Sequence, residues 1–159
     1  MSAIFKILKV APVVAANPVC FRSADGTYMW IERMGMETPE QRKDVGRVFL
    51  STFPNCVRNP VHDTAQPIAR WETKEGIRLG STKRDVLAAY GEPSEDTRIQ
   101  GDSYQSIIVG GFRNGVFTIR PKPNIGDEVL EYMEKDSLLT AEFGLRKGTI
   151  IWMSISENE

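Results

Sequence analysis

Residues 138–155 read LLTAEFGLRKGTIIWMSI and contain the clearest structural pattern in the chain. In the first part of this stretch apolar residues alternate with polar or small ones, which is typical of a strand with one buried face. After a turn at 146–148, residues 149–155 are apolar on both faces, so this strand should lie centrally in a sheet or bury its second face against something else. The residues of this last strand that we expect to face the core are Ile151, Met153 and Ile155.

A short helix is predicted before this hairpin, because residues 82–93 carry a start signal and a stop signal. Thr82 and Asp85 have the spacing of a capping box, in which each side chain bonds a backbone N–H of the other residue. Gly91 suits the left-handed position that ends many helices, and Pro93 prevents continuation. The apolar face of this helix comprises Val86, Ala89 and Tyr90.

The remaining apolar runs predict further strands separated by turns. Asp25-Gly26 is a strong hairpin signal between two β-rich runs, and Asn114-Gly115 is another. Residues 45–53 could be helix or strand; their β-branched and aromatic content favours a strand. The Pro- and Asn-rich segment 54–66, which contains His62, is predicted to be a loop. The other predicted strands are residues 19–22, 27–33, 103–109 and 129–133.

These elements predict an α+β fold in which one helix packs on an antiparallel β-sheet, a two-layer sandwich built from a meander of hairpins. The length of 159 residues suits a single domain spanning residues 1–159. Residues 73–159 supply the helix and the β-meander, and residues 1–72 form a strand-rich half with weaker patterns.

The charge balance argues against nucleic acid as a partner. The net charge is −1 at pH 7 and the isoelectric point is about 5.9, so no basic surface is available to neutralise phosphates. No stretch reaches the roughly 20 apolar residues that span a bilayer. Residues 2–16 look like a secretory leader, but Lys6, Lys9 and Pro12 interrupt the apolar run. We therefore expect neither a nucleic-acid partner nor a transmembrane segment.

Cys20 and Cys56 are the only cysteines and are candidates for a disulfide. The chain has no C-x-x-C motif and a single histidine, so a zinc site lacks ligands. Each cysteine borders a β-rich segment, which suits a bridge across a sheet; two reduced thiols or one reactive thiol are the alternatives. A disulfide indicates an oxidising compartment, so we expect a periplasmic or secreted protein, with a cytoplasmic location as the alternative.

Residues 73–93, TKEGIRLGSTKRDVLAAYGEP, resemble a signature of the form G-I-x-L-G-x-[ST]-x-x-[DE]-V-x-x-x-[LY]-G-x-P. It is similar to the opening of small extracytoplasmic domains such as the β-lactamase inhibitory proteins and the small lipoprotein of the outer-membrane barrel-assembly machinery. Residues 20–27, C-x-x-S-x-D-G-T, resemble a segment of secreted relatives. The resemblance implies a helix followed by a sheet and, in general terms, binding. The chain lacks the lipidation cysteine, so the resemblance does not extend to a membrane anchor.

No catalytic motif is present: the chain has no phosphate-binding loop, no G-x-S-x-G and no H-E-x-x-H. His62 and Asp63 are adjacent on the predicted loop, where neighbouring side chains rarely point together. The acidic run at 127–136 could supply an acid and a base, but strand alternation should leave it on a solvated face with ordinary pKa values. We therefore predict that the protein is not an enzyme and holds no cofactor or metal; an enzyme of unrecognised type is an alternative.

Trp30, Tyr104 and Trp152 are the candidate binding residues, because the chain has more large aromatic side chains than one helix–sheet interface requires. Trp and Tyr are favoured at protein interfaces. Trp152 is the first choice for exposure, since it faces away from Ile151 and its apolar neighbours. We predict an interaction domain for an unidentified protein partner. The alternatives are a small-molecule or lipid carrier with an apolar pocket between helix and sheet, or aromatics that simply fill the core.

Overall fold

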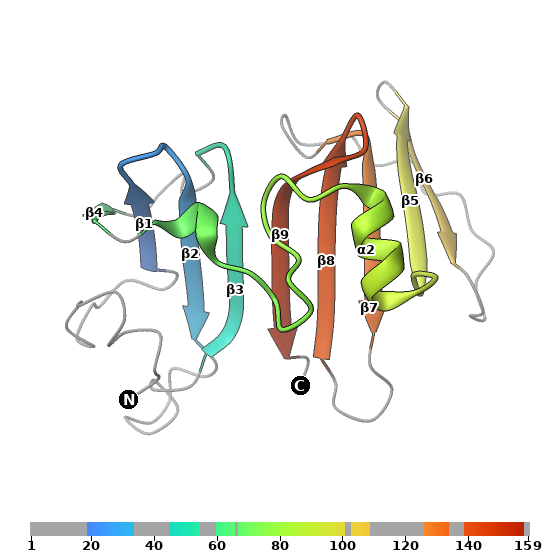
Figure 1. The fold of residues 1–159 in the computed structure, drawn as a ribbon, viewed down its shortest axis with the longest axis horizontal. Helices are drawn as coiled ribbons and strands as arrows, with labels where there is room; N and C mark the ends of the chain where they lie inside the picture. Colours follow the sequence, from blue (N-terminus) through green and yellow to red (C-terminus); the bar gives the residue numbers. More distant parts are fainter. Residues whose placement is uncertain are drawn as a thin grey trace.

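The computed structural model describes residues 19–33, 45–54, 60–65, 67–100, 103–108, 126–133 and 139–157. In these ranges nine strands form one sheet, in the order β4-β1-β2-β3-β9-β8-β7-β5-β6 (Figure 1). Neighbouring strands are antiparallel except for β1 and β4, which are parallel. The strands are β1 (Val19–Ser23), β2 (Tyr28–Arg33), β3 (Val45–Ser51), β4 (Val61–Thr64), β5 (Glu95–Gln100), β6 (Ser103–Ile108), β7 (Glu128–Met133), β8 (Leu139–Arg146) and β9 (Thr149–Glu157). The helical elements are the 3-10 turn η2 (Ile68–Arg70) and the helix α2 (Lys83–Tyr90).

The predicted α+β sandwich, with one helix packed on an antiparallel sheet, is wrong, because the described part of the chain is mainly β. Its single α-helix, α2, has eight residues, so it is about 12 Å long. Strands lie about 4.8 Å apart, and a helix of this length covers only a few of the nine strands. The sheet is wide because β3 pairs with β9. This pairing joins the two halves of the chain in one sheet.

The predicted helix is confirmed together with its N-terminal capping box, and it ends at Gly91 as expected. The side chain of Thr82 accepts a hydrogen bond from the backbone N–H of Asp85, and the Asp85 carboxylate accepts one from the backbone N–H of Thr82. Gly91 ends the helix with φ 77° and ψ −153°. Its φ is positive as predicted, but this ψ lies outside the left-handed helical region, in a region that is essentially restricted to glycine.

Two predicted hairpins are also confirmed. Asp25 closes the β1–β2 turn by accepting hydrogen bonds from Ser23 and from the backbone and hydroxyl of Thr27. These bonds, first that of Ser23, lower the pKa of Asp25. Lys147 and Gly148 form the two-residue β8–β9 turn, and both have positive φ, at 51° and 73°. That combination defines the turn type whose twist matches antiparallel strands.

The strand predicted within residues 45–53 is confirmed as β3, whereas the loop predicted over residues 54–66 is partly wrong. Residues 61–64 of this segment form β4, an edge strand beside β1. This strand could not be predicted from its mainly polar sequence, because it is stabilised by parallel pairing with β1, which is distant in the chain. The hairpin predicted at 114–115 lies outside the described residues.

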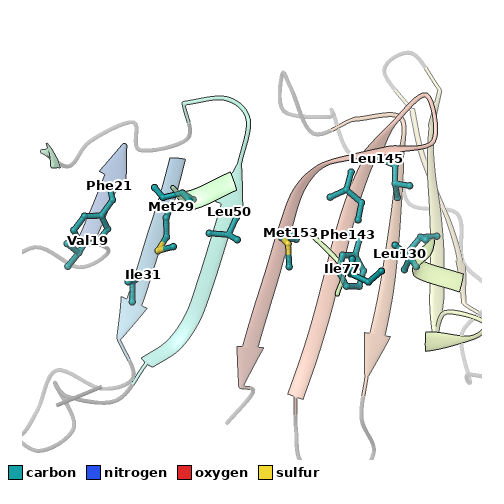
Figure 2. Close-up of a cluster of buried hydrophobic side chains, with 13 residues drawn as sticks. Val19, Phe21, Met29, Ile31, Leu50, Ile77, Leu130, Phe143, Leu145 and Met153 are labelled. Atoms are coloured by element: carbon teal, nitrogen blue, oxygen red, sulfur yellow. The ribbon is translucent and has the colours of Figure 1, made fainter. Parts of the chain in front are cut away.

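The core lies on one face of the sheet, called the core face here. A row of apolar side chains crosses it in register and includes Met29, Leu50, Met153, Phe143 and Leu130. Figure 2 shows this cluster running from β1 to β7. Residues 68–90 cover it. Ile68 of η2, Ile77 of the connecting segment and Val86 of α2 belong to the same buried cluster. Figure 1 shows η2 and α2 on this same side of the sheet.

Candidate functional site

An apolar pocket of about 200 Å³ lies on the core face where β3 meets β9. Val48 and Leu50 of β3 and Met153 and Ile155 of β9 line it, and residues 71–73 complete the wall. Leu50 and Met153 are almost fully buried, whereas 40% of Ile155 is exposed. The pocket therefore has a buried apolar floor and opens to solvent at Ile155.

The pocket exists because the covering layer is discontinuous. η2 contributes Ile68 to the core, and α2 contributes Val86 further along the sheet. Between them the chain passes in front of β9 as a narrow hairpin, closed by a bridge between Glu72 and Arg78 (Figure 1). This hairpin leaves Val48 of β3 and Ile155 of β9 partly exposed, whereas Leu50 and Met153 are buried.

Tyr90 fixes this hairpin above the sheet. Its hydroxyl is hydrogen-bonded to Thr73 and to Glu75, each at 2.7 Å. Its ring stacks on Phe143 of the core at 5.6 Å between centroids. Burial raises the pKa of Tyr90 to about 12. The phenol is therefore neutral at physiological pH and acts as a fixed link between α2, the hairpin and β8.

An open polar hollow of about 570 Å³ adjoins the pocket and shares Glu72 with it. Glu75, Asp85 and Arg78 also line this hollow. The hydrogen bond with Tyr90 lowers the pKa of Glu75, and hydrogen bonds from Thr82 lower the pKa of Asp85. Both carboxylates stay ionised down to acidic pH, so with Glu72 they outnumber Arg78 and give the hollow beside the apolar pocket a net negative charge.

A cluster of ion pairs around Lys83 attaches the start of α2 to the sheet. Lys83 Nζ contacts Glu128 at 2.5 Å and Asp96 at 3.2 Å. Burial alone lowers the pKa of Lys83, but the hydrogen bonds to Glu128 and Asp96 outweigh it and raise the pKa. Arg98 approaches the same two carboxylates at 3.7 and 4.0 Å. These ion pairs set the position of α2 over β5 and β7.

The predicted exposure of Trp152 is wrong, since only 5% of this residue is exposed. Trp152 does lie on the face opposite the core, as expected, but Gly144 on β8 leaves space for its indole. Its ring stacks on Phe49 at 5.1 Å, and Phe49 stacks on Trp30 at 5.3 Å. Trp30 is half-buried. The sequence shows the glycine and the tryptophan, but only the strand register shows that they are opposite each other.

The other predicted site residues are placed only in part. Tyr104 lies on β6, opposite Ile99 of β5, and its side chain is outside what the structure describes. Cys20 is fully buried on β1 and is not a free thiol. Cys56 lies outside the described residues, so its pairing with Cys20 stays a prediction. Cys20, Trp30 and Trp152 do not line the apolar pocket.

Two predictions about polar residues need correction. His62 is on β4 rather than on a solvated loop, and its half-buried ring lies 6.0 Å from that of Phe21. The neighbouring Asp63 pairs with Arg22 at 2.8 Å and not with the histidine. The acidic run is not uniformly solvated either, because Glu128 and Glu131 are half-buried. Burial, followed by the charges of Glu142 and Glu95, raises the pKa of Glu131.

Within the described residues, no helix is long and apolar enough to cross a membrane, and no group of three His, Cys, Asp or Glu residues could hold a metal ion. A comparison of the chain with models of protein families, with curated proteins and with solved structures found no match in any of the three. The pocket and its charged rim are therefore interpreted from their own geometry.

Proposed function

We propose that this protein is a non-catalytic interaction domain that binds a protein partner by accepting one of its apolar side chains in the β3–β9 pocket. The observation that carries the proposal is the pocket itself, with a buried floor at Leu50 and Met153 and an accessible edge at Ile155. Burying apolar surface of a partner there removes it from water at roughly 25 cal/mol per Å². Met153 can adapt its shape to different side chains.

The size of the pocket favours a side chain over a free ligand. Its volume is about 200 Å³, whereas small-molecule sites are roughly 300–1,000 Å³. A hydrophobic anchor that fills a pocket, surrounded by polar contacts, is the usual form of a hot spot in a protein interface. The negatively charged rim of Glu72 and Glu75 supplies such polar contacts and favours a partner with a basic residue near its apolar anchor.

The alternative function is that of a carrier for a small apolar molecule, which the mainly apolar lining of the pocket also favours. Such a ligand would have to be small, because an apolar cavity of about 150 Å³ holds a molecule the size of benzene. The experiment below separates the carrier from the interaction domain.

We propose further that Cys20 and Cys56 form a disulfide and that the protein works in an oxidising, periplasmic or secreted environment. Cys20 is fully buried and is not a free thiol, and Cys56 is the only other cysteine in the chain. The resemblance of residues 73–93 to small extracytoplasmic domains supports the same location.

The proposed binding mode is tested by filling the pocket with Val48→Phe. Peptides are selected from a displayed random library on the wild-type domain, and the affinities of synthetic copies are measured. We expect the peptides to share an aromatic or branched aliphatic residue, and Val48→Phe to weaken their binding at least tenfold. Val61→Phe is the matched control, since Val61 is exposed on β4 away from the pocket. Thermal unfolding establishes that both variants fold.

Two results would contradict the interaction domain. Peptides that bind Val48→Phe as tightly as wild type would use a different surface. If no peptide is selected and the wild type instead binds a small apolar molecule such as benzene in a Val48→Phe-sensitive manner, the carrier is correct.

A further inference from the structure

The face of the sheet opposite the core carries three carboxylates in a row. Strand register places Glu95 of β5 opposite Glu131 of β7, and Glu131 opposite Glu142 of β8. Side chains paired in this way have Cβ atoms about 4.5–5.5 Å apart, and like charges at such positions are destabilising. An arrangement that lowers stability in this way is typical of a functional site.

Glu131 and Glu142 have no adjacent cationic side chain in the described part of the chain. Glu131 and Glu142 are half-buried there and form no ion pair or side-chain hydrogen bond among the described residues. On this face no Lys or Arg lies directly opposite either residue or two positions along its strand; the cation of β8, Arg146, is four residues from Glu142. The pKa of Glu131 is raised, first by burial and then by the two neighbouring carboxylates.

Ser154 of β9 continues the row and is the second indication of a ligand. Register places it directly between Glu142 and Phe49 of β3. Only 1% of Ser154 is exposed, and its Oγ has no hydrogen-bond partner. Buried hydroxyls are normally hydrogen-bonded, and each exception requires an explanation. Beyond Ser154 lies the half-buried Phe49, which stacks between Trp30 and Trp152.

We propose that this row is a binding site for an organic cation, a guanidinium or ammonium group. The cation lies between the carboxylates of Glu131 and Glu142, and Ser154 Oγ accepts a hydrogen bond from it. The site is on the opposite side of the sheet from the β3–β9 pocket, so it is independent of the function proposed above.

The test uses two probes that represent the two sources of such a group. Spermidine represents a free polyamine, and acetyl-Gly-Arg-Gly-amide represents a basic side chain of a protein. Binding to the full chain is measured by calorimetry at low salt and pH 7, and again at high salt, where screening should weaken it. Glu131→Gln combined with Glu142→Gln should reduce the affinity for the bound probe at least tenfold. Glu92→Gln, which removes an exposed carboxylate just after α2 and outside both pockets, should leave it unchanged.

Ser154→Ala separates binding from folding. It removes a buried hydroxyl without a partner, so we expect a higher unfolding temperature. The same change should weaken probe binding several-fold, because the hydrogen bond to the cation is lost. The double glutamine variant should also unfold at a higher temperature than wild type at pH 7, since it relieves repulsion; lost binding would then not reflect a damaged fold.

Three outcomes would overturn the proposal. One is that neither probe binds the wild type at low millimolar concentration. Another is that the double glutamine variant binds as tightly as wild type. The third is that Ca²⁺ binds through these carboxylates while both organic probes fail, which would make the row a metal site. None of these outcomes affects the β3–β9 pocket, and the Val48→Phe variant should bind the cationic probes as wild type does.

Discussion

Gly144 and Trp152 act as a pair at the scale of single residues. A Cβ at position 144 would overlap the indole of Trp152, so the absence of a side chain at Gly144 is what allows the tryptophan to lie flat and buried. Trp152→Ala should lower the free energy of unfolding by about 3–5 kcal/mol, as removing a buried tryptophan usually does. Gly144→Ala should also destabilise, but much less once Trp152 has been replaced by alanine. A double-mutant cycle of denaturant unfolding measures this coupling, and fully additive effects would contradict it.

Gly91 is a residue whose importance is conformational and not steric. No atom outside its chain neighbours lies within 4 Å of a Cβ built there, yet its φ of 77° and ψ of −153° are unfavourable for any other residue. Gly91→Val should therefore lower the free energy of unfolding by about 1–3 kcal/mol. Ala88→Val, on the exposed side of the same helix, is the control and should cost about 0.7 kcal/mol or less. Equal denaturation midpoints for Gly91→Val and wild type would mean that the backbone here relaxes without cost.

At the scale of elements, α2 depends on its capping box, because eight residues are too few for a helix that is stable alone. Thr82→Ala should cost about 1 kcal/mol, as the loss of an N-cap typically does. The pKa of Asp85 is lowered in the folded state, first by the backbone N–H of Thr82. Its contribution to stability is therefore present above the ordinary pKa of 3.8 and is lost as pH falls through the folded value.

Asp85→Asn measures this contribution directly. The difference in unfolding free energy between wild type and the variant should be present at pH 7 and should shrink below about pH 4. Glu72→Gln, on the hairpin outside the capping box, provides a control with the same loss of charge. A difference that stays constant down to pH 2 would show that Asp85 does not act through its charge.

Local elements could be predicted from the sequence because their signals are local. The capping box of Thr82 and Asp85, the turn at Asp25-Gly26 and the alternation in residues 139–145 each specify structure within a few residues. β4 could not be predicted, since its four residues, three of them polar, become a strand only by pairing with β1. The candidate pocket was hidden for the same reason: Val48 and Ile155 meet in register, although more than 100 residues separate them in the chain.

At the scale of the whole molecule, the pairing of β3 with β9 decides both the fold class and the candidate site. It converts a strand-rich half and a helix-plus-meander half into one sheet with two large faces. The core face bears the pocket and the opposite face bears the carboxylate row, so the two proposed sites are separated by the thickness of the sheet. The surplus of aromatic residues indicated a binding surface. Instead, the rings of Trp152 and Phe49 stack on each other, and Trp152 is buried.

The proposed disulfide is also a property of the whole molecule, because it would connect β1 to the segment that follows β3. Cys20 and Cys56 are 36 residues apart in the chain, and closing a loop of this length stabilises a protein by about 3–4 kcal/mol on the chain-entropy model. Adding a reductant should therefore lower the free energy of unfolding by about that amount. The Cys20→Ala/Cys56→Ala double variant should be insensitive to reductant. Protein isolated from its native compartment should show no free thiol when titrated under denaturing, non-reducing conditions. Two titratable thiols would rule out the bond and, with it, the argument for an oxidising compartment.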